Sequence, residues 1–163
     1  MLFDHFIGVL GLLVGIIGII LAVRSDRKLR TAEQARKRVE RTFKQYMAAQ
    51  EFQKLAMDGL ALIQEVTAGA WQSATPIANR IGADLLKARG GHAPLLTTLE
   101  RDKLDVAVAE FQQFILSLPL GQPQLTAQQT QAMISPCLTL AHTASELGGR
   151  LGVESMSETE EEK

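Results

Sequence analysis

The feature that most constrains this chain is an uninterrupted apolar segment near its start. Residues Phe6 to Val23 read FIGVLGLLVGIIGIILAV and include no charged or strongly polar side chain. As a helix rising about 1.5 Å per residue, this segment spans roughly 27 Å, close to the bilayer hydrocarbon thickness of about 30 Å. A helix also satisfies its own backbone hydrogen bonds, as lipid requires. The segment is therefore predicted to be a transmembrane helix.

The charges around this segment favour an uncleaved anchor over a cleaved signal peptide. A signal peptide carries positive charge before its apolar stretch, whereas residues 1–5 (MLFDH) contain no Lys or Arg. A buried core helix, the other alternative, would be expected to keep one polar face. The basic residues instead follow the apolar segment directly, where we expect them to contact lipid head groups: Arg24, Arg27, Lys28 and Arg30.

The same asymmetry predicts how the chain is oriented. Residues 24–44 contain nine basic and three acidic side chains, and basic flanks stay on the cytoplasmic side of a membrane. We therefore expect a single-pass inner-membrane protein with residues 1–5 outside and the rest of the chain in the cytoplasm. A single cysteine, Cys137, excludes an internal disulfide and fits a reducing compartment.

Small residues recur within the apolar segment at alternating spacings of three and four. This spacing places them on one face of a helix, where small side chains let two membrane helices approach closely. The pattern predicts a homo-oligomer, although glycine is also common in membrane helices without such a role. The residues of this predicted packing face are Gly8, Gly11, Gly15, Gly18 and Ala22.

The remainder of the chain has helix signals and almost no strand signals. A long amphipathic helix is expected over 31–71, and Thr75-Pro76 is typical of the start of the next helix, which Gly90-Gly91 should end. Capping-box patterns at Thr97 and Thr126 predict two further helices. The expected fold is all-α, with a single N-terminal transmembrane helix followed by a cytoplasmic bundle of about four helices.

The expected organisation has five parts: a short N-terminus (1–5), the transmembrane helix (6–23), a basic juxtamembrane region with a long amphipathic helix (24–72), the remaining bundle helices (73–150), and a disordered acidic tail (151–163). In the long helix, an apolar stripe that begins at Val39, Phe43 and Tyr46 is expected to continue in a shifted phase and to enter the core. Its continuation comprises Phe52, Leu55, Gly59, Leu62 and Val66, widened by Leu60 and Ile63.

Catalytic signals are weak. His142 and Glu146 lie four residues apart and could form an acid–base pair, but a solvated polar pair explains them equally well. Cys137 falls on an apolar helix face and is expected in the core. No metal-ligand spacing and no phosphate-binding loop is present. We therefore expect no catalytic, cofactor-binding or metal-binding residues and no enzymatic activity.

These observations predict a membrane-anchored helical scaffold or protein-interaction module. Its expected partners are the lipid bilayer, further copies of the chain and an unidentified protein. Nucleic acid is not expected, because the net charge is −1 and the basic stretch lacks stacking aromatics. Two alternatives stay open. One is a holin-like or defence-type effector whose membrane helices assemble into a lesion; the other is an anchored ligand-binding bundle using His142, Glu146, Asp84 or Arg80.

Overall fold

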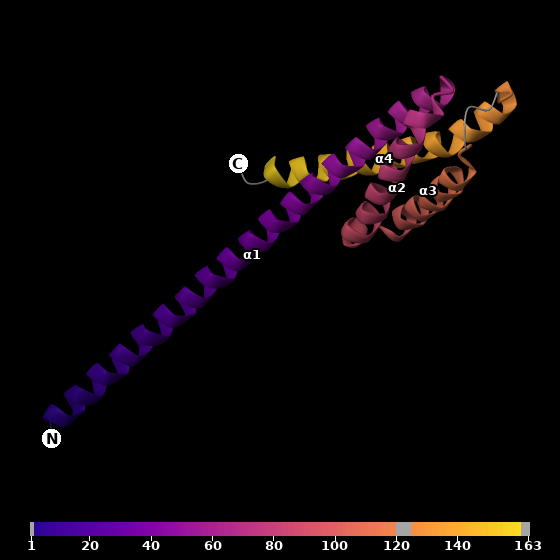
Figure 1. Cartoon of the computed structure of the whole chain (residues 1–163). Coiled ribbons are helices and arrows are strands. Elements are labelled where there is room, and N and C mark those ends of the chain that lie inside the picture. Colours follow the sequence, from indigo (N-terminus) through magenta and orange to yellow (C-terminus); the bar gives the residue numbers. More distant parts are fainter. Residues whose placement is uncertain (1, 120–124, 161–163) are drawn as a thin grey trace. The chain divides into compact units, whose positions relative to one another are not determined.

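The computed structural model describes the backbone of residues 2–119 and 125–160, and the side chains of 32–119 and 125–157. Its elements are α1 (Leu2–Thr67), α2 (Trp71–His92), the short 3₁₀ helix η1 (Ala93–Leu95), α3 (Thr98–Ser117) and α4 (Ala127–Glu160) (Figure 1). The described residues contain no strand, which confirms the all-α prediction. The chain divides into two compact units, Met1–Arg41 and Thr42–Lys163.

The predicted transmembrane segment, residues 6–23, lies outside the residues whose side chains are described. The side chains of its predicted packing face and of its basic flank also lie outside the described residues: Gly8, Gly11, Gly15, Gly18, Ala22, Arg24, Arg27, Lys28 and Arg30. Within the part of the chain that is described, no helix combines the length and the apolar character that crossing a bilayer requires.

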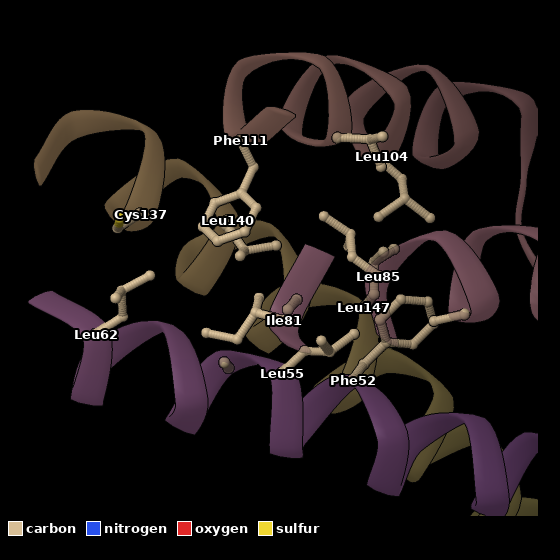
Figure 2. Close-up of a cluster of buried hydrophobic side chains, with 14 of the residues drawn as sticks. Phe52, Leu55, Leu62, Ile81, Leu85, Leu104, Phe111, Cys137, Leu140 and Leu147 are labelled. Carbon is tan, nitrogen blue, oxygen red and sulfur yellow. The ribbon is translucent and has the colours of Figure 1, made fainter. Parts of the chain in front are cut away.

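The second unit is a bundle in which residues 42–67 of α1 pack with α2, α3 and α4. All four helices contribute side chains to one apolar core, and Figure 2 shows them pointing toward one another. Burying such a side chain contributes about 1.5–3 kcal/mol, so the core is the main source of stability. The predicted helical bundle is confirmed. Its largest fully buried side chains are Phe52, Leu62, Val66, Ile81, Leu85, Leu104, Phe111, Cys137, Leu140, Leu147 and Leu151.

A glycine-centred turn joins α1 to α2. Gly69 has a φ of +69°, a backbone conformation that an L side chain rarely adopts. The Ala70 N–H donates to the Glu65 carbonyl over 2.9 Å, and the Gly69 N–H donates to the Val66 carbonyl over 3.1 Å. This pair of bonds is the Schellman motif, which satisfies the last carbonyls of a helix. The turn lets α2 begin four residues after α1 ends.

The start predicted for α2 at Thr75-Pro76 is wrong. The helix begins at Trp71, and Pro76 lies inside it. The Thr75 hydroxyl does not cap a helix start and donates to the Trp71 carbonyl over 2.9 Å. The reason lies in tertiary contacts. The turn at Gly69 places the Trp71 side chain in the core, where it is 4% exposed, and the helix begins at that residue. The predicted end of this helix agrees better with the structure, since α2 ends at His92, directly after Gly90 and Gly91.

The two predicted capping boxes are confirmed. At the start of α3, the Glu100 N–H donates to Thr97 Oγ1 over 3.3 Å, and the Thr97 N–H donates to Glu100 Oε2 over 2.8 Å. Thr126 and Gln129 exchange the same two bonds at the start of α4, over 3.3 and 2.9 Å. Each box satisfies two N–H groups that have no partner within the helix.

Helix α4 extends further than expected. It contains Pro136 without restarting and continues to Glu160, so the prediction of a disordered tail from residue 151 is wrong for residues 151–160. Leu151 is fully buried and Ser155 is 6% exposed. Burial of these side chains holds the helix in place despite the acidic composition of the segment that follows.

Candidate interaction surface

Within the second unit, α1 presents two different faces. The residues that face the bundle recur at spacings of three and four: Gln45, Ala48, Phe52, Leu55, Gly59, Leu62 and Val66. A second set has the same spacing in another phase and is exposed: Phe43, Tyr46, Gln50, Gln53, Met57 and Leu60. At about 100° per residue the centres of the two sets lie roughly 160° apart, so they occupy nearly opposite sides of the helix. We call the second set the outer face of α1.

The outer face corrects the expectation of one core stripe along α1. Phe43 is 62% exposed, Tyr46 50% and Leu60 53%, and Val39 in the first unit is 65% exposed. The shift in phase after Tyr46 is therefore a change of face and not a continuation of the core. Apolar side chains that are exposed at regular helical spacing are typical of a surface that binds another helix.

A shallow apolar groove lies beside the outer face, between α1 and α4. It holds about 480 Å³ and opens to solvent. The groove is lined from α1 by Gln53, Ala56, Met57 and Leu60, and from α4 by Leu138, Ala141, His142 and Ser145.

Glycines bring α1 and α4 close together along this groove. A Cβ at Gly148 would lie 3.1 Å from the Ala49 carbonyl oxygen, and a Cβ at Gly59 would lie 3.4 Å from Ala141 Cβ. Because Gly148 lies against Ala49 and Gly59 against Ala141, the two helices run antiparallel. Their close approach leaves the longer side chains of Met57 and Leu138 at the rim, exposed to solvent.

The pair suggested for acid–base chemistry does not form. Glu146 accepts a hydrogen bond from Lys103 Nζ of α3 over 2.7 Å. His142 is exposed and lines the groove. Its imidazole is therefore a polar group at the edge of the apolar surface, one turn away from a carboxylate that already has a partner.

Arg80 and Asp84, considered for a ligand pocket, form ion pairs between α2 and α1. Lys54 Nζ lies 3.0 Å from Asp84 Oδ2, and Arg80 Nη2 lies 3.7 Å from Asp58 Oδ1. Neither side chain lines the groove that contains His142. The four polar residues of that hypothesis therefore do not converge on one cavity.

Arg150 of α4 joins three elements, which the sequence analysis did not anticipate. Its Nε lies 2.5 Å from Glu100 Oε1, its Nη1 lies 2.6 Å from Glu154 Oε1, and its Nη2 donates to the Leu95 carbonyl over 3.1 Å. Glu100 is thus both a member of the capping box of α3 and the ion-pair partner of a cation fifty residues later in the chain. Only the Glu154 contact, at i,i+4 spacing, has a signal in the sequence.

Glu100 is expected to make the bundle acid-sensitive. Burial opposes its ionisation, but hydrogen bonds from Thr97 and the charge of Arg150 outweigh that effect and lower the pKa of Glu100. Because the folded pKa lies below the ordinary value of 4.5, this stabilisation is complete above pH 4.5 and is lost as the pH falls through the folded pKa. We expect Glu100→Gln to lower the free energy of unfolding by about 1.5–3 kcal/mol at pH 7.

Urea unfolding, followed by the fluorescence of the only tryptophan, Trp71, measures this effect. The difference between wild type and Glu100→Gln should shrink when the measurement is repeated at a pH below the folded pKa of Glu100, where the wild-type carboxyl group is also neutral. A difference that stays constant between the two pH values would contradict the role given to the Glu100 charge.

Cys137 is a core residue, as predicted. Its side chain is fully buried, and burial raises the pKa of the thiol to about 12. A protonated thiol without access to solvent is a poor nucleophile. Among the described residues, no group of three His, Cys, Asp or Glu side chains is placed to hold a metal ion.

No protein-family model, curated protein or solved structure matches this chain.

Proposed function

We propose that this protein is a membrane-anchored helical interaction module that associates with copies of itself. The observation that carries the proposal is the pair of faces on α1, one occupied by the chain's own bundle and the other apolar and exposed. A folded domain that keeps aromatic and aliphatic side chains in water at helical spacing is suited to binding a helix.

The anchor in this proposal is the uncharged segment 6–23 with its basic flank. In this arrangement residues 1–5 lie outside the inner membrane and the bundle lies in the cytoplasm. The glycine face at residues 8–22 supports association within the membrane.

Membrane fractionation with topology labelling tests the anchor. The full-length chain should stay in the membrane pellet after alkaline extraction. A membrane-impermeant maleimide added to intact cells should label His5→Cys and leave Gln112→Cys unlabelled until the cells are lysed; Gln112 is an exposed α3 residue, and the buried native Cys137 should not react in either case. Recovery of the chain in the aqueous fraction, or labelling of Gln112→Cys in intact cells, would refute the anchored arrangement.

A further inference from the structure

We infer that the outer face of α1 binds the outer face of a second copy of this chain, with the two helices parallel and in register. The inference rests on the proposed self-association and names the surface and the geometry that achieve it. It also assigns a role to apolar side chains that the bundle leaves exposed to solvent.

The spacing of the outer face is that of a coiled-coil seam. Its alternation of three and four residues matches the a and d positions of a heptad, where side chains of one helix fit between those of its partner. Apolar residues lie at both ends of the seam: Phe43 and Tyr46 at one end, Met57 and Leu60 at the other. Gln50 and Gln53 lie between them. Polar residues at such positions favour one alignment of the two helices, since any other would place an amide against an apolar side chain.

The sequence upstream indicates that the partner is a second copy. Upstream of Phe43, most positions at this spacing carry small or apolar side chains, and Arg36 and Ser25 are the two polar exceptions. The small and apolar ones are Val39, Ala32, Leu29, Ala22, Gly18, Gly15, Gly11 and Gly8. A helix that pairs with its own copy needs one phase throughout its length, whereas an unrelated partner would impose no such phase on the glycines. Two copies anchored with the same topology are also parallel.

Charges beside the seam fit the parallel arrangement. In a parallel pair, a residue just before an a position lies across from the residue five positions later on the partner helix. Lys28 and Glu33 occupy two such positions, so each copy would offer a cation opposite the other's anion. Glu33 also lies 3.1 Å from Lys37 Nζ of its own helix, so the two cations would share this carboxylate. Opposite charges at these positions set orientation more than affinity.

The bundle leaves room for this partner. The residues of α1 that face the bundle lie on nearly the opposite side of the helix, so the outer face is open along residues 43–60. On one flank, the groove adds Leu138 and His142 of α4 to the contact surface. Because the same patch is used on both copies, the interface is isologous and closes as a dimer.

The expected affinity depends on the membrane. Two glutamine pairs at the centre weaken the seam relative to an apolar one. Confining both copies to one bilayer by their anchors raises their effective concentration to about millimolar, which compensates for weak contacts. The anchor and the seam therefore both shift the equilibrium between monomer and dimer toward the dimer.

Cysteine cross-linking of the full-length chain in isolated membranes tests the seam. Tyr46→Cys and Gln53→Cys, made separately, should each form a disulfide with its own copy under mild oxidation, at least tenfold more than Gln112→Cys on α3. Seven residues separate the two positions, about 10 Å along the helix, so an antiparallel pair could not bring both next to their own copies. Adding Met57→Glu to Gln53→Cys should reduce the cross-link about tenfold, because it places two carboxylates on the seam.

Three results would overturn the inference: cross-linking at only one of the two seam positions, cross-linking of Gln112→Cys as strong as at position 53, or no effect of Met57→Glu. Met57 is 72% exposed, so its substitution leaves the core unchanged, and urea unfolding followed by Trp71 fluorescence checks this. If the chain proves to be aqueous, the same cross-links made at high protein concentration still test the seam. Failure of the anchor and failure of the seam are therefore distinguishable.

Discussion

Replacing Phe52 with alanine is expected to lower the free energy of unfolding of the bundle by about 3–5 kcal/mol. Phe52 is fully buried among side chains of the bundle, and its ring lies 5.8 Å from that of His92. Alanine would leave a cavity that rigid helices can close only in part. Since single domains unfold with about 5–15 kcal/mol, the loss is a large fraction of the total. Urea unfolding followed by the fluorescence of Trp71 measures it.

Phe43→Ala is the matched control on the same helix. The same substitution on the outer face, where the ring is 62% exposed, should change the free energy of unfolding by no more than about 0.5 kcal/mol. Instead, it should weaken the cross-link at Gln53→Cys. Comparable losses of stability for the two variants would contradict the division of α1 into a core face and an outer face.

The second large effect is expected at Gly148. A Cβ there would lie 3.1 Å from the Ala49 carbonyl oxygen and 3.2 Å from the Gln53 backbone nitrogen, so the contact is with backbone that cannot turn aside. Gly148→Val should force α4 away from α1 and destabilise the bundle by about 3 kcal/mol, within the range found for overpacked sites. Thermal unfolding, again followed by Trp71, reports the change.

Substitution of the neighbouring Gly149 is expected to have the opposite effect on the stability of the bundle. A Cβ at Gly149 meets nothing within 4 Å, so Gly149→Ala only removes the flexibility of a glycine inside a helix. That change should stabilise the bundle by about 0.5–1 kcal/mol. The close approach of α1 and α4 would be disproved if valine at 148 were tolerated as well as alanine at 149.

Local signals in the sequence located the elements that depend on local physics. The capping boxes at Thr97 and Thr126 involve residues three apart, and both form as expected. On α3, Leu104, Val108 and Phe111 recur at helical spacing and all three are buried. Such features need only the helix itself to be present.

The misassigned features depend on contacts between distant residues. Thr75-Pro76 has the composition of a helix start, but the burial of Trp71 moves the start upstream. The phase shift along α1 allows two interpretations, one bent core stripe or two separate faces. Only the packing of the other helices against α1 distinguishes them. The ion pair between Arg150 and Glu100 joins residues fifty positions apart, so local sequence spacing cannot predict it.

The ion pairs between α1 and α2 also fix how far one helix can slide along the other. Lys54 faces Asp84 and Asp58 faces Arg80 in this antiparallel pair. A slip of one turn in one direction would place Lys54 opposite Arg80, and a slip in the other would place Asp58 opposite Asp84. Exposed pairs of this kind contribute at most about 1 kcal/mol each. Their larger effect is that a slip of one turn in either direction would bring two like charges together, which disfavours both of these misaligned arrangements.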